Sequence, residues 1–308
     1  MELYFLKPII RTAIWGGNNL RDYYNFDDYR DDTGQLWCVS AQDENNACKV
    51  LNGEYKDRTL FDIWNEHPEY FNSKYNDFPY IIGLLGPTAD LSIQIHPNDE
   101  YARKLGLKFG KNESWYFIEV GDNDGLVAGV NAANEEELRK YIDENRWNEL
   151  IKRLKVNKGD FVNIKAGNLH ALPKDYLTYE VQRGSDVTYR FYDYDRLDKD
   201  GNKRELHLER AIECLDYNAS LESFEKIVEE YDGYTKTTLI SNEDYTIFRL
   251  DIKSKAEIDV DRYMLLTCID GEGLINDYKI RKGDSCLVPL GLNKIVLSGE
   301  MVIMGVNE

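Results

Sequence analysis

The chain has 308 residues, enough for one large domain or two smaller ones. Its formal net charge of −18 at pH 7 argues against nucleic-acid and anionic-membrane partners, because phosphate binding depends on clustered Lys and Arg. No stretch approaches the roughly 20 apolar residues that cross a bilayer, and the opening residues lack the apolar run of a signal peptide. We therefore expect a cytoplasmic protein.

The cysteines indicate neither a disulfide framework nor a thiolate metal site. They are odd in number, widely scattered, and contain no CxxC pair. The five positions are Cys38, Cys48, Cys214, Cys268 and Cys286.

The N-terminal part is predicted to contain short strands and one helix. Residues 1–20 indicate strand and turn, with a Gly-Gly pair after Trp15. Residues 59–70 predict a short amphipathic helix that begins at an N-capping Thr59.

Two strands are predicted next, and both carry polar residues at informative places. In DLSIQIHP the apolar residues alternate, so a period of two puts Gln94 and His96 on the same face, and Pro97 ends the strand. The aromatic-rich residues 113–120 predict the second strand, with Glu113 at its start.

The remaining chain is predicted to have two helices among strands. Residues 133–155 show the clearest helical pattern, and residues 205–217 predict a second helix. The stretches 159–167 and 178–195 predict strands, and from about residue 234 the pattern is almost entirely strand and turn.

Two of the four histidines, together with one glutamate, form a plausible metal-ligand set. The set consists of residues that each lie at a predicted strand edge or glycine turn: His96, Glu113 and His170. The other two histidines, His67 and His207, are interpreted as plain surface or helix residues. Two imidazoles and one carboxylate commonly hold catalytic zinc with one position left open. Their wide spacing fits neither a zinc finger nor an HExxH helix. The same set can hold Fe(II), so an iron oxygenase is chemically allowed.

One internal comparison suggests a repeated unit. Residues 158–172 align without gaps on residues 282–296, sharing the KGD triplet and a later glycine. His170 then corresponds to Lys294, so the second copy would lack this metal ligand.

Four motifs occur in this order: QIHPNDEYA, GKNESWY, AGNLHAL and SDVTYRFYDYDR. Together with the opening KPIIRTAIWGG, they resemble the type I mannose-6-phosphate isomerases, most of all the short bacterial form. The resemblance has specific motifs from about residue 6 to 196 and is looser toward the C terminus.

The resemblance implies a mainly β fold of two cupin-like β barrels, or jelly rolls, with inserted helices. The catalytic, metal-binding domain would span residues 1–215 and contain the helical segment at about 133–155. Residues 216–308 would form a degenerate cupin-like barrel without metal ligands, in agreement with the internal comparison.

The resemblance also implies an aldose-ketose isomerase that interconverts mannose 6-phosphate and fructose 6-phosphate through an enediol. One Zn²⁺ per chain would bind His96, Glu113 and His170, with Gln94 as a further ligand. The implied catalytic residues are Arg190, Lys111 and Asp186. An always-charged arginine suits the stabilisation of an enediolate, and Lys111 or Asp186 could open the sugar ring.

The expected partner is therefore a sugar phosphate, with no nucleic acid and no membrane, and the chain is expected as a monomer or homodimer. The rival hypothesis is a non-catalytic metal-binding cupin that senses a sugar phosphate. Such a protein needs the ligands but not Lys111, Asp186 and Arg190 together. Two departures from the family pattern stand out: Gln42 stands where the family has a histidine, and Arg183-Gly184 lies in a stretch where polar residues are more usual.

Overall fold

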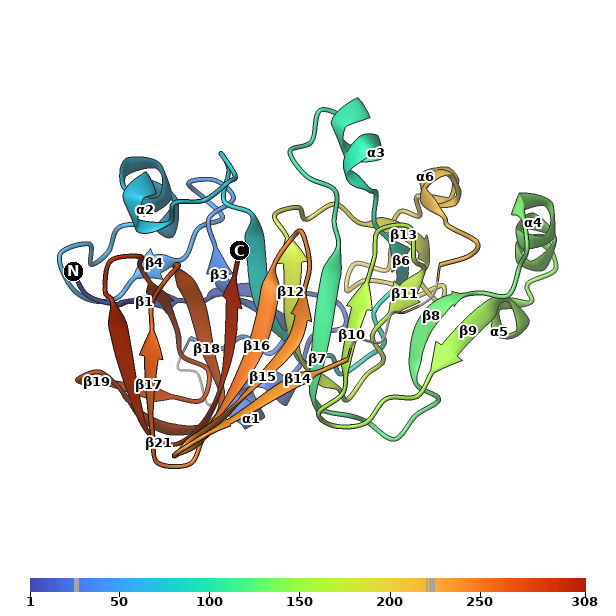
Figure 1. Ribbon diagram of the computed structural model, residues 1–308. Coiled ribbons are helices and arrows are strands. Elements are labelled where there is room, and N and C mark those ends of the chain that lie inside the picture. The colour runs from blue at the N-terminus through green and yellow to red at the C-terminus, as the bar shows by residue number, and fades with distance from the viewer. Residues whose placement is uncertain (25–27, 220, 222–224) are drawn as a thin grey trace. The chain divides into compact units, whose positions relative to one another are not determined.

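The computed structural model describes residues 1–24, 28–219, 221 and 225–308, and it is mainly β, as expected (Figure 1). The chain divides into two compact units, the first made of residues 1–9, 36–83 and 224–308, the second of residues 10–35 and 84–223. This division differs from the sequential one expected at residue 215, because residues 1–9 and 36–83 group with the C-terminal residues. The strand at the N terminus causes this grouping, since it pairs with a strand at Ser285–Val288.

The first unit is built on a ten-stranded antiparallel sheet. Its strand order is β14-β15-β16-β21-β18-β20-β1-β4, with β17 on β21 and β19 on β18. The strands are β1 (Tyr4–Lys7), β4 (Lys49–Val50), β14 (Ile227–Tyr231), β15 (Tyr234–Ser241), β16 (Thr246–Ile252), β17 (Lys255–Asp259), β18 (Met264–Ile275), β19 (Tyr278–Arg281), β20 (Ser285–Val288) and β21 (Lys294–Asn307). The unit also holds α2 (Leu60–Glu66) and the 3-10 helix η1 (Pro68–Tyr70), and a reciprocal capping box between Thr59 and Asp62 confirms the predicted N-cap.

Two further sheets contain the remaining strands. The six-stranded sheet has the order β10-β7-β12-β5-β3-β2, and the five-stranded sheet has the order β13-β6-β11-β8-β9. Their strands are β2 (Ile9–Thr12), β3 (Thr33–Ser40), β5 (Tyr80–Leu85), β6 (Ile93–Ile95), β7 (Glu113–Glu119), β8 (Leu126–Val130), β9 (Ile151–Leu154), β10 (Phe161–Ile164), β11 (His170–Ala171), β12 (Leu177–Arg183) and β13 (Tyr189–Tyr192). The other helices are α1 (Asn19–Tyr24), α3 (Asp99–Lys104), α4 (Glu135–Asp143), α5 (Trp147–Leu150) and α6 (Leu208–Cys214).

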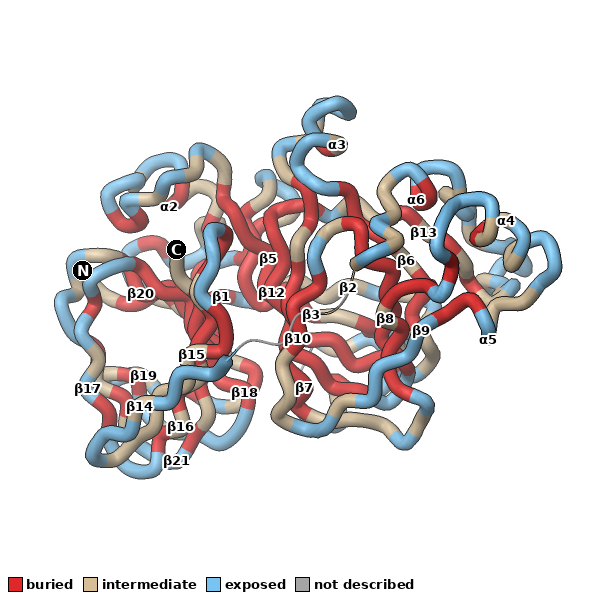
Figure 2. The backbone as a smooth tube through the Cα atoms, turned by 45° about the vertical axis from the view of Figure 1, so that its right-hand side comes forward, coloured by how far each residue is buried: buried red, intermediate tan, exposed pale blue. Residues whose placement is uncertain are grey.

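Helices cover one face of the five-stranded sheet and leave the other face for polar side chains. Leu138 of α4 and Ile212 of α6 share a buried cluster with Ile93 and Ile95 of β6 and Phe191 of β13. Figure 2 shows this pattern as buried strands beneath helices that are largely exposed on their outer side. Because side chains alternate along a strand, the residues between these apolar positions lie on the opposite face.

The predicted helix at residues 133–155 is only partly correct. Helices α4 and α5 occupy its first part, but residues 151–154 form β9, which pairs antiparallel with β8 through Leu126–Leu154 and Val130–Ile151. The apolar residues Ile151 and Leu154 fit a helical period, so only the long-range pairing distinguishes the strand.

The two segments compared by sequence have the same local structure. Strands β10 and β20 begin at the same offset after Lys158 and Lys282, and the glycines that coincide in the alignment all have positive φ. The next strands, β11 and β21, begin at the aligned residues His170 and Lys294. The structure thus supports a repeated unit. At the aligned position the first copy has a histidine, His170, and the second has a lysine, Lys294.

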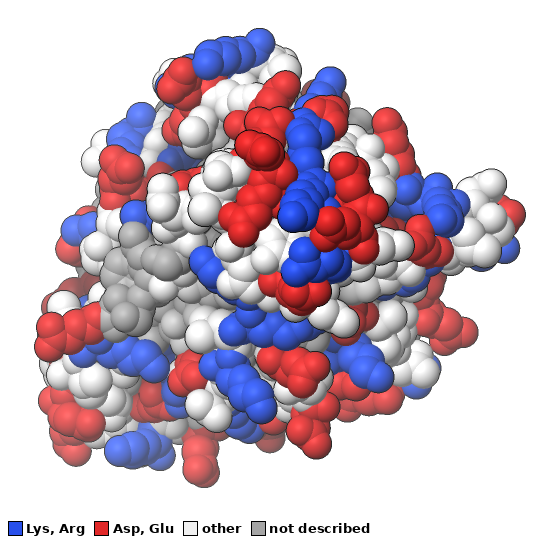
Figure 3. All heavy atoms as spheres, turned by 90° about the vertical axis from the view of Figure 1, so that its right-hand side faces the viewer, with Lys and Arg blue, Asp and Glu red and all other residues white. Residues whose placement is uncertain are grey.

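Basic and acidic side chains are mixed on one face of the molecule. On the face shown in Figure 3, Lys and Arg side chains are interspersed with Asp and Glu, and the described residues form no continuous basic surface there. Within the described ranges, no helix is both long enough and apolar enough to span a membrane.

Candidate metal centre

Strand register brings three of the predicted site residues into one row. Gln94 of β6 lies directly opposite His170 of β11 on one side and Arg190 of β13 on the other. Directly opposed residues point to the same face of a sheet, so all three side chains lie on the face that the helices leave open. His96 follows β6 two residues after Gln94 and extends the row, as the alternation predicted.

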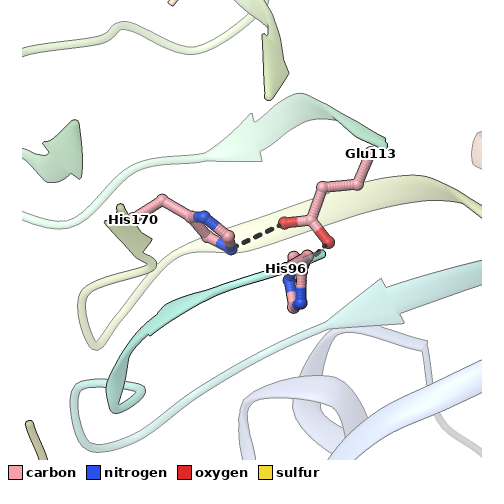
Figure 4. Close-up of side chains that lie close together, drawn as sticks. All are labelled: His96, Glu113 and His170. Atoms are coloured by element: carbon pink, nitrogen blue, oxygen red, sulfur yellow. Dashed lines mark ion pairs between the residues drawn. The ribbon is translucent and has the colours of Figure 1, made fainter. Parts of the chain in front are cut away.

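His96, Glu113 and His170 meet as the sequence predicted (Figure 4). His170 Nε2 lies 3.0 Å from one carboxylate oxygen of Glu113, and His96 Nε2 lies 3.4 Å from the other. All three residues are at most 1% exposed, and their ligand atoms lie within 4.8 Å of one another. The structure therefore confirms a buried three-residue group with the composition of a metal site.

The histidine tautomers are set by backbone contacts. His96 Nδ1 donates to the Val187 carbonyl at 2.8 Å, and His170 Nδ1 donates to the Asn168 carbonyl at 2.9 Å. In the neutral form of each ring, the lone pair therefore lies on Nε2, the nitrogen that faces Glu113. Donation of the second ring nitrogen to a carbonyl is how metal-binding histidines are normally oriented.

Several atoms of this group lack a hydrogen-bonding partner. Among the described residues, His96 Nε2 and both Glu113 carboxylate oxygens are buried without a hydrogen bond. The two imidazoles and Lys111 lie near the Glu113 oxygens, but burying a carboxylate without well-formed hydrogen bonds is costly. A divalent cation would satisfy all of these buried atoms, so the residues present fit a bound metal.

Electrostatics favour the ligand forms that a metal requires. Burial and the nearby Lys111 ammonium lower the pKa of His96 to about 4, so its imidazole is neutral at pH 7. Burial opposes ionisation of Glu113, but the pKa of this carboxyl is held well below its usual range, first of all by the Lys111 ammonium. Metals bind neutral imidazole and ionised carboxylate, so His96 and Glu113 have the forms that a metal requires.

Gln94 is placed to complete the group. Its side-chain amide lies 3.5 Å from His170 Nε2, close enough for the amide oxygen to face the same point after a half-turn of the amide. This geometry supports the predicted fourth ligand.

Lys111 is the charged neighbour of the group. Its side chain is buried, and Nζ lies 3.3 Å from a Glu113 oxygen. Burial would lower the pKa of Lys111, but the carboxylates of Glu113, Glu180 and Asp186 outweigh burial and raise it. Lys111 is therefore a protonated donor beside His96, Glu113 and His170.

Arg190 has a different environment from the other arginines near it. Among the described residues it forms no ion pair, its Nε is buried without a partner, and its Nη1 donates to the Glu205 carbonyl at 2.6 Å. Two further arginines close to it, Arg196 and Arg204, both pair with the buried carboxylate of Asp193. Arg190 thus remains available for an anionic ligand.

Asp186 is the most exposed of the predicted catalytic residues. Its side chain is 58% exposed and lies 3.4 Å from an Arg11 guanidinium nitrogen. Neighbouring Ser185 is buried, and its carbonyl accepts a hydrogen bond from Gln182 at 3.0 Å.

The departures from the family pattern have structural roles. The amide of Gln42 donates to the Tyr80 carbonyl at 3.0 Å in the first unit. The buried Arg183 guanidinium lies 4.7 Å from the centre of the Phe109 ring.

Sequence reasoning missed Glu180, a buried carboxyl in β12. It lies opposite Trp115 in the register of β12 and β7, and it accepts hydrogen bonds from Trp115 Nε1 at 2.9 Å and from Gln35 Nε2 at 2.7 Å. Burial and the Glu113 carboxylate raise the pKa of Glu180 to about 7. One charge within the apolar strand LTYEV was the signal that could have identified it.

Glu180 should make the stability of the metal-free protein depend on pH. The pKa of this carboxyl is about 7 in the folded state against an ordinary 4.5, so between these values the folded state holds a proton that the unfolded state has released. Its contribution to the free energy of unfolding should therefore fall as pH rises through this window, with a slope no steeper than 2.303RT per pH unit, the limit for one proton.

Urea unfolding of wild type and Glu180→Gln from pH 5 to pH 7 measures this contribution as a difference. The comparison cancels the opposite trend from His96, whose pKa is lowered. The variant should gain stability relative to wild type as pH rises. A difference that stays constant across the range would show that Glu180 titrates normally.

Comparisons with known proteins point to one family. Residues 3–155 match the model described as phosphomannose isomerase type I, catalytic domain, and residues 235–307 match the model described as mannose-6-phosphate isomerase, cupin domain.

Full-length relatives give the same picture. The chain is 37% identical over 306 residues to the mannose-6-phosphate isomerase ManA of Bacillus subtilis, covering 97% of this chain and 96% of that protein. It is 33% identical to the mannose-6-phosphate isomerase of Streptococcus mutans, covering 98% and 97%. The crystal structure of a mannose 6-phosphate isomerase from Bacillus subtilis superposes with a TM-score of 0.95 at 33% identity, and all of both chains is covered.

Proposed function

This chain belongs to the type I phosphomannose isomerase family, and from this premise we propose how its residues carry out the reaction. It is a mannose-6-phosphate isomerase, an aldose-ketose isomerase that interconverts mannose 6-phosphate and fructose 6-phosphate. The observation that carries the proposal is the buried His96–Glu113–His170 group, flanked by the cations of Lys111 and Arg190.

The metal we propose is one Zn²⁺ per chain, held by His96, Glu113 and His170 with Gln94 as a fourth ligand. Two imidazoles and one carboxylate are a common zinc ligand set, and the preset tautomers and the unpaired buried atoms support it. When bound, zinc supplies a Lewis acid that favours negative charge on sugar oxygens without redox chemistry.

Lys111 and Arg190 supply the remaining positive charge. Isomerisation moves a proton between C1 and C2 through an enediol, and negative charge develops on the oxygens in the transition state. We assign Arg190 to the stabilisation of this charge, because its guanidinium has no carboxylate partner among the described residues. We assign Lys111 to proton donation during ring opening, since its raised pKa keeps it protonated.

Asp186 is the acid–base residue that we propose at the exposed side of the site. Its position allows contact with solvent and with Arg11, and its charge contributes to the raised pKa of Lys111. A carboxylate there can accept the proton that ring opening releases.

A coupled assay that follows fructose 6-phosphate from mannose 6-phosphate tests the proposal. Turnover should disappear after chelation and return on addition of Zn²⁺, because the four proposed ligands would no longer hold a Lewis acid. A folded, zinc-loaded protein without turnover would contradict the proposed reaction and favour the sugar-phosphate sensor. Turnover that survives removal of all metal, verified by elemental analysis, would contradict the role of zinc.

A further inference from the structure

We infer that His207 is a positioning residue for Arg190, acting as the neutral acceptor that fixes the strand carrying the guanidinium. The inference rests on the proposed function, because it assigns His207 a role in the same isomerisation. His207 lies immediately before α6, and sequence reasoning had treated it as a plain surface or helix residue.

His207 binds both backbone polar groups of Arg190. The Arg190 N–H donates to His207 Nδ1 at 3.1 Å, and the His207 N–H donates to the Arg190 carbonyl at 2.8 Å. β13 is the end strand of its sheet, so these groups point to an edge where no strand of that sheet pairs. His207 therefore replaces a neighbouring strand, with one backbone and one side-chain hydrogen bond.

The same segment also holds the far end of the Arg190 side chain. Arg190 Nη1 donates to the Glu205 carbonyl at 2.6 Å. Residues 205–207 thus fix Arg190 at its backbone and at its guanidinium. An arginine has many rotamers, and restricting them before the substrate arrives lowers the entropy that catalysis must overcome.

The location of these contacts explains why they matter for the site. The pairing of β13 with β6 loses its regular register between Arg190 and Tyr192, directly after the residue opposite Gln94. A strand end with a register shift is held less well by its own ladder. His207 connects this point to α6, which is anchored in the core by Ala211 and Ile212.

The contact requires a neutral imidazole with its proton on Nε2. A protonated ring has no lone pair for the Arg190 N–H. The charged groups around the ring are the guanidinium groups of Arg190 and Arg210 and the Glu205 carboxylate, which lies 4.0 Å from Nε2. Burial and the Arg190 charge lower the pKa of His207, so the acceptor form prevails at neutral pH.

Two substitutions separate the acceptor from the bulk of the ring. His207→Phe keeps a ring but removes the acceptor, whereas His207→Asn keeps an acceptor oxygen near the position of Nδ1. We expect His207→Phe to lower kcat on the order of tenfold or more with stoichiometric zinc retained, because a small displacement of a catalytic group is costly. His207→Asn should recover most of kcat, and KM should change less than kcat in both variants.

His67→Phe is the matched control. This histidine lies in the first unit, where its Nδ1 lies 3.0 Å from a Glu69 carboxylate oxygen, and its replacement should leave kcat unchanged. A comparable loss of kcat in His67→Phe would show that the assay reports general damage, and would remove the support of the His207→Phe result.

A double-mutant cycle with Arg190→Ala tests whether His207 acts through Arg190. In the Arg190→Ala background, His207→Phe should have little further effect on kcat. The same fold-loss in both backgrounds would overturn the inference, as would wild-type kcat in His207→Phe.

The cycle also separates this inference from the proposed function. Wild-type protein without turnover would contradict the proposed function itself. If the wild type is active but His207→Phe and Arg190→Ala lower kcat independently, only the role of His207 would be contradicted. Nitrogen-15 NMR of the wild-type imidazoles gives a check that needs no variant. An unprotonated Nδ1 at neutral pH is expected for His207, and a protonated Nδ1 would overturn the inference.

Discussion

Replacing His170 by alanine is expected to yield a folded protein that no longer retains stoichiometric zinc and turns over mannose 6-phosphate at least about a thousandfold more slowly. The physical reason is that His170 lies close to both Glu113 and Gln94. Its Nε2 lies 3.0 Å from Glu113 and 3.5 Å from the Gln94 amide. Removing it leaves the Glu113 carboxylate beside one imidazole and Lys111.

Elemental analysis of purified His170→Ala after dialysis measures its metal content. This content shows whether His170 binds the metal or only lies near it. The small side chain of the variant also leaves a space beside the Trp115 ring, which lies 5.6 Å from the imidazole centre. We therefore expect some loss of stability as well, on the order of 1–3 kcal/mol. Circular dichroism must confirm that the variant is folded.

His67→Ala serves as the control for this experiment, because it removes an imidazole outside the site. It should keep full zinc content and full turnover. Stoichiometric zinc in His170→Ala would contradict the ligand role, and the preset tautomer of His170 would then need another explanation.

Much of the site could be predicted because its information is local. Period-two alternation placed Gln94 and His96 on one face of a strand, and the structure confirms that arrangement. His96 and His170 stood out because the chain has only four histidines. Such signals depend on a few neighbouring residues, so they can be recognised without knowledge of the fold.

The parts that escaped prediction depend on contacts between distant segments. β11 has only two residues, so no periodicity reveals that His170 pairs with Gln94. The segment 151–154 became a strand because β8 pairs with it, and its own apolar spacing suited a helix equally well. Glu180 was missed because a buried carboxyl needs partners, here Trp115 and Gln35, that only the fold supplies.

The role of a charged residue was likewise only half visible in the sequence. Arg190 and Arg196 lie in one motif, but Asp193 neutralises Arg196 together with Arg204, whereas Arg190 contacts a carbonyl. The family resemblance singled out Arg190, but the sequence alone does not show which of these arginines has a carboxylate partner. Their partners in the fold decide which one can meet a developing negative charge.

Arg190→Ala should therefore separate chemistry from metal binding. We expect zinc content and fold to be unchanged and kcat to fall roughly 10²–10³-fold, the loss typical of removing one charge-stabilising group from an active site. Fold should survive because Arg190 forms no ion pair among the described residues, and its backbone bonds to His207 do not depend on its side chain.

Arg190→Lys sharpens this prediction. Lysine keeps the charge but presents a point charge instead of a planar fork, so it should recover only part of the lost kcat. Arg204→Lys is the matched control, since Arg204 already contacts Asp193 through two hydrogen bonds and should affect stability more than kcat. Full turnover by Arg190→Ala would remove Arg190 from the mechanism. Loss of zinc in that variant would instead make it part of the metal site, because Gln94 lies directly opposite it in the sheet.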